Sequence, residues 1–584
     1  METLQGIPVS PGVAIGKALV LRGEDFFTIP KGEIQAEEIP KEIVRFEEAL
    51  TKTRSELYAV RKKIALDLGH EHSDIFSAHL LILEDRTLIE DVLSRIKEER
   101  VSAEYAFSIV IQRYFHAFAQ INDEYLKERI SDIKDVGKRI LQNLRGEQKD
   151  SLVNLKEEVI VIAHDLSPSE TAMMDREHVI AFATDIGGPT SHTAIMARSM
   201  EIPAVVGLDR ISKEVSNGDM IVIDGNRGVA IVNPDPVTID RYTREEKRFV
   251  ELVSELDKLK SLTAETLDGH RLHLMANIEF PDEIPSVIAH GAEGIGLYRT
   301  EYFYMNRSDL PTEEEQFKAY QHVAEQLSPK PVVIRTLDLG GDKFLSSLDL
   351  PREMNPFMGW RAIRFCLTRV DIFKTQLRAI LRASVFGDLK LMYPMVSNLV
   401  ELKKANQILE EVRQDLLKEH VAFDEKMQVG AMIEIPSAAL TSDVLAREAD
   451  FFSIGTNDLI QYSLAVDRVN EKIAYLYEPT HPAILKLIQY TITSGKKAKI
   501  WVSVCGEMGG DPAMALLLLG LGIDQLSMSS FALPKVKKTI RSVTFKQAKD
   551  IAARALEFTT GDEIKQFAET KLKAIIPDLF EESS

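Results

Sequence analysis

Residues 389–436, LKLMYPMVSNLVELKKANQILEEVRQDLLKEHVAFDEKMQVGAMIEIP, carry the pattern that decides the fold. The apolar segments LKLMYPM and VGAMIEIP are typical of buried strands, and NLVELKKANQILEEVRQDLLK between them is long enough for a helix. A strand, a helix and a strand in this order form the repeating unit of a parallel sheet.

Six further segments between about residue 270 and residue 530 have the same strand character: LHLMANI, GIGLYRTE, VVIRTLD, FFSIGTNDL, WVSVCGE and QLSMS. About eight parallel strands with crossover helices over roughly 300 residues are what a TIM (β/α)8 barrel requires. A doubly wound open sheet is the alternative fold.

The first part of the chain has a different texture. Residues 1–20 and 149–232 contain short β-branched segments between Gly, Pro and Asp, whereas residues 21–148 have apolar positions at helical spacing. We therefore expect a multidomain α/β protein, in which an α/β domain (1–20 plus 149–232) carries an inserted helical-bundle domain (21–148). A charged linker helix (233–262) then leads to a C-terminal barrel (263–575).

The composition excludes several classes of protein. The 584 residues carry a net charge of −19 and no long Lys/Arg block, so a nucleic-acid partner is not expected. Two widely separated cysteines fit a reducing compartment. The N-terminus lacks the pattern of a signal peptide, and the longest apolar run, AMALLLLGLGI, is shorter than the roughly 20 residues of a membrane span. We expect a cytoplasmic protein without membrane insertion.

Charged or reactive residues follow at least four of the expected barrel strands, where the active site of a TIM barrel lies. Several arginines suit a ligand with a phosphate and a carboxylate, because guanidinium groups bind both through paired hydrogen bonds. Two carboxylates suit Mg²⁺, and a cysteine beside such a pocket can act as a proton donor or a nucleophile. The residues are Arg299, Glu301, Arg335, Asp338, Arg361, Glu434, Asn457, Asp458, Arg468, Cys505 and Glu507.

A second chemical signal is GGPTSHTAIMAR, residues 187–198. Thr190 or Ser191 can cap a helix there, which places His192 in its first turn. A helix N-terminus disfavours the imidazolium and favours a bound anion, so His192 is suited to act as a nucleophile that receives a phosphoryl group.

The segment GGPTSHTAIMARSMEIPAVVG resembles the phosphohistidine signature of phosphoenolpyruvate-utilising enzymes. The segments GLYRTEYFYM, NPFMGWRAIR, MIEIPSAA, IGTNDLIQYSLAVDR and VCGEMGGDP resemble the barrel motifs of one branch. That branch is the enzyme I family of the bacterial phosphoenolpyruvate:sugar phosphotransferase system, the phosphoenolpyruvate–protein phosphotransferases. The resemblance covers nearly the whole chain.

The resemblance implies a role for each residue that matches a family motif. It implies that His192 takes the phosphoryl group on Nε2, that Thr171 orients the imidazole and that Cys505 protonates the enolate to give pyruvate. It further implies that phosphoenolpyruvate binds Arg299, Arg335, Arg361, Asn457 and Arg468, and that Mg²⁺ binds Glu434 and Asp458. The helical domain is, by resemblance, the docking surface of the phosphocarrier protein HPr, and the barrel is the homodimerisation domain.

Two features depart from the family pattern. Pro189 follows Gly188 where family members often carry a basic or other side chain, and proline fixes φ and removes an N–H. In the helical segment, His70 and His72 soften the negative charge of a patch that is expected to meet a basic carrier.

Two other functions are open. One is an ATP-using dikinase or synthase of the same superfamily, but the residues before His192 offer no Gly-rich phosphate loop. The other is a regulatory protein that binds phosphoenolpyruvate without turnover, against which the intact His192, Cys505, Glu434 and Asp458 argue.

Overall fold

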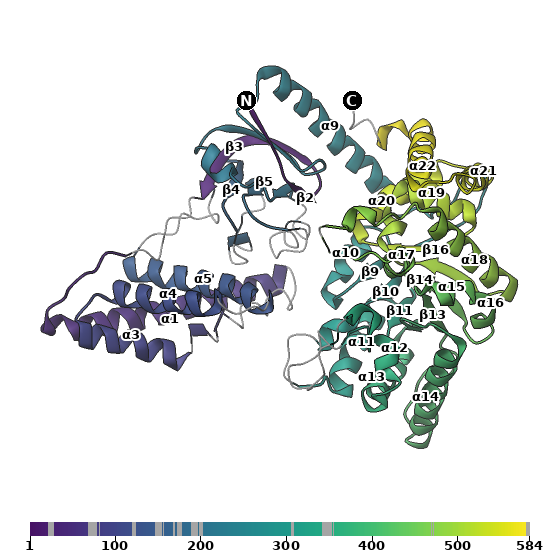
Figure 1. Ribbon diagram of the computed structural model, residues 1–584, viewed down its shortest axis with the longest axis horizontal. Coiled ribbons are helices and arrows are strands. Elements are labelled where there is room, and N and C mark those ends of the chain that lie inside the picture. The colour runs from purple at the N-terminus through teal and green to yellow at the C-terminus, as the bar shows by residue number, and fades with distance from the viewer. Residues whose placement is uncertain are drawn as a thin grey trace. The chain divides into compact units, whose positions relative to one another are not determined.

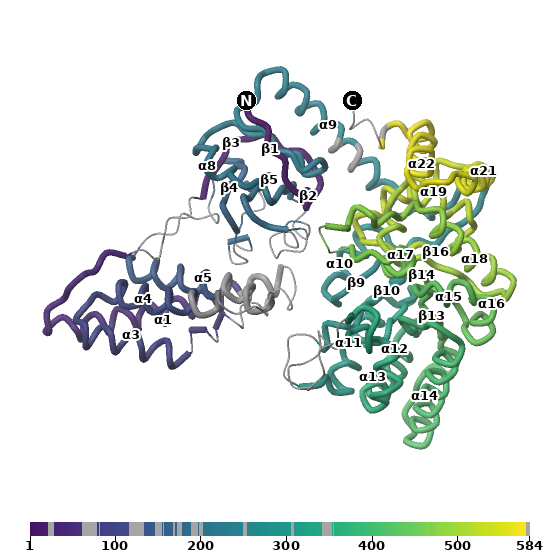
Figure 2. The backbone as a smooth tube through the Cα atoms, viewed as in Figure 1, coloured from purple at the N-terminus to yellow at the C-terminus, as the bar shows by residue number. Residues whose placement is uncertain are grey.

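The computed structural model (Figures 1 and 2) forms two compact units, Met1–Glu251 and Leu252–Ser584. It describes residues 1–21, 29–67, 79–80, 82–83, 85–119, 124–146, 155, 157–166, 170–171, 174, 178–188, 197, 202–304, 309–340, 353, 355–468, 470 and 472–579.

The second unit is built on a closed barrel in which each strand pairs in parallel with the next along the chain, and the last pairs with the first. This closure confirms the predicted TIM barrel and excludes the open sheet. The strands are β9 (His273–Ile278), β10 (Ile295–Tyr298), β11 (Val332–Arg335), β12 (Leu389–Tyr393), β13 (Val429–Ile433), β14 (Phe451–Ile454), β15 (Trp501–Val504) and β16 (Gln525–Met528).

The stretch 389–436 folds as its pattern predicts, with α14 (Leu399–Lys418) between β12 and β13. Asn398 caps the helix, because its Oδ1 accepts hydrogen bonds from the backbone N–H groups of Val400 (2.9 Å) and Glu401 (3.1 Å). The face of α14 that is buried against the barrel recurs at helical spacing: Leu402, Ala405, Leu409, Val412 and Leu416.

Further helices surround the barrel. The apolar run AMALLLLGLGI lies largely in α19 (Pro512–Leu521). This helix packs so closely on α21 (Phe545–Ala555) that a side chain at Gly520 would meet the Ala548 carbonyl oxygen. The helices are α10 (Ile284–Ala289), α11 (Glu313–Leu327), α12 (Ala362–Cys366), α13 (Val370–Ala383), α15 (Pro436–Leu440), α16 (Ser442–Leu445), α17 (Thr456–Leu464), α18 (Pro482–Ala498), α19 (Pro512–Leu521), α20 (Leu533–Arg541), α21 (Phe545–Ala555) and α22 (Gly561–Ile575).

The first unit contains an eight-stranded mixed sheet of order β1-β8-β7-β3-β4-β5-β6-β2. Strands from the first residues of the chain are interleaved with strands from the segment after the helices, so the two segments build one sheet. The strands are β1 (Glu2–Gln5), β2 (Ile7–Ser10), β3 (Val13–Leu21), β4 (Val159–Ala163), β5 (Val179–Thr184), β6 (Ala204–Val206), β7 (Met220–Asp224) and β8 (Val229–Val232), with the short helix α8 (Ile211–Glu214).

Between β3 and β4 the chain forms the helices α1 (Ile39–Asp67), α3 (Arg86–Glu99), α4 (Ala103–Ala119) and α5 (Glu124–Arg145). They share one apolar core that includes Phe46, Leu57, Val92, Phe107 and Ile140. The α/β fold with an inserted helical bundle is therefore confirmed.

The linker helix α9 (Pro236–Lys258) lies within the predicted linker, residues 233–262. Pro236 is the first helical residue, where its fixed φ suits the helix and its missing N–H costs nothing. Asp235 precedes it and accepts the backbone N–H of Thr238 at 2.7 Å.

Within the described ranges, the structure holds no helix with both the length and the apolar character that a bilayer crossing requires.

Candidate active site

The carboxyl ends of the parallel barrel strands meet at one end of the barrel, and the predicted residues follow these ends. Arg299 comes directly after β10, Arg335 ends β11, Glu434 follows β13 and Cys505 follows β15. Asn457 and Asp458 lie in the first turn of α17, after β14.

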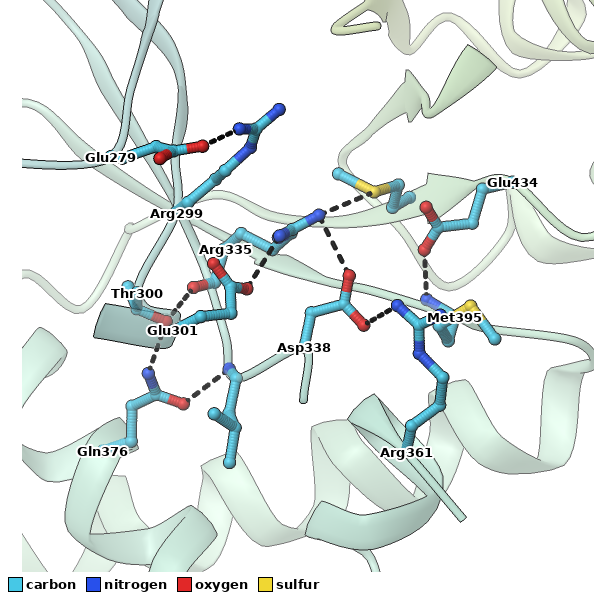
Figure 3. Close-up of polar contacts among 12 residues, drawn as sticks. Glu279, Arg299, Thr300, Glu301, Arg335, Asp338, Arg361, Gln376, Met395 and Glu434 are labelled. Carbon is cyan, nitrogen blue, oxygen red and sulfur yellow. Dashed lines mark hydrogen bonds and ion pairs between the residues drawn. The ribbon is translucent and has the colours of Figure 1, made fainter. Parts of the chain in front are cut away.

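A buried ion-pair network holds two of the arginines (Figure 3). Arg335 Nη2 donates to Glu301 Oε1 at 2.7 Å, and its Nη1 lies 3.1 Å from Asp338 Oδ2. Arg361 Nη2 donates to the other oxygen of Asp338 at 2.7 Å. Burial lowers the pKa of Arg335, but Glu301 and Asp338 raise it by more, so the guanidinium remains charged.

Both buried arginines retain an unused donor. The Nε atoms of Arg335 and Arg361 are buried, and neither has a hydrogen-bond partner among the described residues. Buried polar groups are normally paired. A bound anion is one partner that such donors can take.

Left-handed backbone conformations occur at two places beside this network. Ala362, directly after Arg361, has a φ of 52°, and Met395 has a φ of 57°. Such conformations are uncommon for residues other than glycine and are frequent at functional sites. At Met395 the conformation accompanies a 2.5 Å hydrogen bond from its N–H to Glu434 Oε1.

A second set of polar residues is more exposed. Arg468 Nη1 donates to Glu507 Oε1 at 2.7 Å, and the Glu507 N–H donates to Asn457 Oδ1 at 3.2 Å. Gly506 permits this approach of β15 to α17, because a side chain there would lie 1.9 Å from Thr456 Oγ1. Arg299 is paired in a similar way with Glu279.

Glu434 has the properties of a cation ligand. Burial raises the pKa of its carboxyl group well above the ordinary value, and the negative charges of Asp458 and Asp338 raise it further. A cation bound between Glu434 and Asp458 would offset this repulsion. The described residues contain no group of three or more His, Cys, Asp or Glu that could hold a metal, but two carboxylates with substrate oxygens and water are a usual Mg²⁺ set.

The Cys505 thiol is a protonated group inside the same barrel. Its side chain is buried, and burial raises its pKa to about 11. Its Sγ lies 3.6 Å from the Ile454 carbonyl oxygen. A thiol that keeps its proton at neutral pH is suited to donate it rather than to act as a nucleophile. The structure describes both cysteines, Cys366 and Cys505, as free.

The other predicted site belongs to the first unit. His192 and Pro189 lie outside the described residues, as do His70 and His72. Thr171 is buried, and its carbonyl oxygen accepts the N–H of Met174 at 3.2 Å. The structure therefore describes the surroundings of the predicted phosphohistidine only in part.

Polar residues lie at the carboxyl ends of β4 and β5, which precede His192 in the chain. Gly187, which follows β5, has a φ of 134°, a conformation that L side chains rarely adopt. Buried Asp185 accepts from Ser212 N at 2.8 Å and lies 2.8 Å from His164 Nδ1, so it fixes the ends of β4 and β5 together.

One residue that supports the site was missed in the sequence. Buried Gln376 in α13 donates to Thr300 Oγ1 at 3.0 Å and accepts the N–H of Leu337 at 2.9 Å, thereby joining the ends of β10 and β11. The signal was a glutamine on the apolar face of a strongly amphipathic helix, a position where a polar side chain needs a partner.

Comparisons with known proteins agree with this arrangement. Three family models match the chain: PEP-utilising enzyme, N-terminal (residues 5–129), mobile domain (155–228) and PEP-binding domain (253–545). Several relatives carry the name phosphoenolpyruvate-protein phosphotransferase. Those of Bacillus sp. (strain S) and Geobacillus stearothermophilus are each 47% identical over 97% of both chains.

The relative from Haemophilus influenzae is 46% identical over 97% of this chain and 98% of its own length. Relatives at this identity span the helical segment, the α/β sheet and the barrel alike. The chain therefore belongs to the phosphoenolpyruvate-protein phosphotransferase family, the enzyme I transferases of the phosphotransferase system.

Proposed function

We propose that the protein transfers the phosphoryl group of phosphoenolpyruvate to its own His192, releases pyruvate, and passes the phosphoryl group to a histidine of the phosphocarrier protein HPr. This is the first general step of the sugar phosphotransferase system. The observation that carries the proposal is the set of arginines at the carboxyl ends of the barrel strands, which includes two buried guanidinium groups with unused Nε donors.

Phosphoenolpyruvate carries a phosphate and a carboxylate, and the proposed ligands suit both. Arginine binds each group through parallel N–H donors, and buried carboxylates already orient Arg335 and Arg361. Arg299, Arg468 and Asn457 supply further donors. Phosphoryl transfer depends mainly on positioning and on stabilising charge, which is what this set can provide.

Glu434 and Asp458 would hold Mg²⁺ in this proposal. When bound, the ion neutralises charge on the transferring phosphoryl group and on the developing enolate. The fit rests on the buried, electrostatically strained carboxylate of Glu434 and on the chemistry of the two oxygen donors.

The chemical step then follows from the remaining side chains. His192 Nε2 attacks phosphorus in line, the N–P bond forms, and the bond from phosphorus to the enol oxygen breaks. The enolate takes a proton at C3 from the Cys505 thiol, which gives pyruvate. Thr171 positions the imidazole through its hydroxyl group.

The remaining assignments follow the family. We assign residues 1–20 and 149–232 to the phosphohistidine domain, and 21–148 to HPr docking. We assign 233–262 to the linker, and 263–575 to substrate binding and homodimerisation, in a cytoplasmic protein. Because one histidine has to meet both phosphoenolpyruvate and HPr, the proposal requires it to serve the two partners in turn.

Intact-mass analysis after incubation with phosphoenolpyruvate and Mg²⁺ tests the proposal. We expect one acid-labile phosphoryl addition in the wild-type protein and none in His192→Ala. Adding purified HPr should remove the group from the protein and place it on HPr. An unmodified wild-type protein would refute the transfer.

A further inference from the structure

The carboxylates that pair with the candidate substrate-binding arginines fall into two classes. Glu301 and Asp338 form the largely buried class, with side chains 13% and 3% exposed. The Asp338 side chain is only 3% exposed and bridges Arg335 and Arg361, with contacts of 3.1 and 2.7 Å. Removing such a partner would leave a buried charge unpaired, so these carboxylates are fixed parts of the site.

Glu279 and Glu507 form the exposed class. The Glu507 side chain is 74% exposed and its Oε1 lies 2.7 Å from Arg468 Nη1. The same oxygen accepts from Asn457 Nδ2 at 3.4 Å. The Glu279 side chain is 52% exposed and pairs with Arg299.

The difference in exposure has an energetic consequence. Ion pairs in contact with water contribute little, because each partner loses little by returning to solvent. A phosphate or carboxylate of the substrate, by contrast, can take two parallel hydrogen bonds from one guanidinium. A doubly or triply charged ligand therefore displaces an exposed Glu more readily than a buried Asp.

We propose that Glu279 and Glu507 are exchangeable counter-ions, which hold Arg299, Arg468 and Asn457 before substrate binds and are displaced by the anionic groups of phosphoenolpyruvate. The inference rests on the proposed function for the identity of the ligand. In this arrangement the two glutamates position the donors of the free protein and compete with the substrate. They thereby set its affinity.

Removing the negative charge of a competitor should tighten substrate binding. We expect Glu507→Gln to lower the dissociation constant of phosphoenolpyruvate by a factor of about 1.4 to 5, the range that exposed ion pairs span. Glu279→Gln should have a similar effect, and the two effects should multiply because each glutamate faces a different arginine.

Equilibrium calorimetry with phosphoenolpyruvate and Mg²⁺ on the full chain measures this directly. The His192→Ala background prevents turnover. Glu419→Gln is the matched control, because Glu419 is a half-exposed carboxylate 2.7 Å from Arg378 in the same unit and lies outside the proposed site. It should leave the dissociation constant unchanged.

Three results would overturn the inference. An unchanged dissociation constant in both glutamine variants would show that neither carboxylate competes. A raised constant would show that the glutamates support the bound state. Tighter binding by Glu507→Gln in a protein whose wild type accepts no phosphoryl group would instead refute the proposed function and support the exchange. No binding of phosphoenolpyruvate at all would refute both.

Discussion

The two regions that carry the predicted chemistry both use the carboxyl ends of parallel strands, but they use them differently. In the barrel, ring closure brings residues from many strands together, and Arg335, Glu301, Asp338 and Arg361 hold one another in a buried network. In the part of the α/β sheet that the structure describes, Asp185 joins the ends of β4 and β5.

This difference indicates different tasks. Charged groups fixed at the end of a closed barrel can offer donors to a compact polyanion from several directions. This arrangement is electrostatic preorganisation. A strand end that is followed by a glycine-containing loop suits one reactive side chain that partners have to reach from outside. This contrast supports the proposal that the barrel holds the donor of the phosphoryl group and that the α/β domain presents its acceptor.

The largest effect that would sharpen this comparison is expected at Cys505. Its replacement by alanine removes the proposed proton donor without enlarging the buried side chain, and general acids typically contribute a factor of about 10² to 10⁴. Pyruvate formation should fall by that order, as measured with a coupled dehydrogenase.

Binding of phosphoenolpyruvate by Cys505→Ala should change little in calorimetry. The Cys366→Ala variant is the control, because Cys366 is a buried core residue of the same unit. Normal pyruvate release by Cys505→Ala would assign the proton to another group.

A second test concerns the buried network. Arg335→Met removes the charge that Glu301 and Asp338 share, and breaking a buried pair typically costs about 3–5 kcal/mol. We expect this loss in the unfolding free energy of the second unit, measured by denaturant titration. Lys418→Met removes an exposed pair with Asp415 and should stay within about 0.5 kcal/mol. Equal losses would mean that the network is not a fixed scaffold.

The sequence allowed the barrel strands to be predicted, because they are short, largely apolar runs, and charged or reactive residues follow at least four of them. It also placed Arg299, Arg335, Glu434 and Cys505 at strand ends. Which carboxylate meets which guanidinium could not be predicted, because those pairings depend on distances across the ring. Gln376 was missed for a related reason: its partners come from two neighbouring strands that are far from it in the chain.

The pH dependence of thiol reactivity tests the environment of Cys505. A thiol with a pKa of about 11 is roughly 1% ionised at pH 9, whereas one with the ordinary value of 9.0 is half ionised. Because only the thiolate reacts, alkylation of Cys505 should rise about tenfold per pH unit up to pH 11. The thiolate fraction at pH 9 should be about 50-fold below that of the unfolded chain.

This measurement is made in the Cys366→Ala background, with iodoacetamide and mass spectrometry. The urea-unfolded chain is the reference, and its rate should level off near pH 9. A folded protein whose alkylation levels off at the same pH would show that the barrel does not keep the thiol protonated.

The smallest effect is expected at the α/β edge, at Thr171. Its side chain is buried, so Thr171→Val keeps the volume and removes only the hydroxyl group that is proposed to orient His192. One hydrogen bond is worth about 0.5–1.5 kcal/mol, which corresponds to at most about a tenfold slower phosphorylation of His192 in rapid-quench experiments. Thr171→Ser retains the hydroxyl and should recover most of the rate. If Thr171→Val kept the rate and Thr171→Ser lost it, the methyl group rather than the hydroxyl would matter, and the α/β domain would depend on packing around its reactive group.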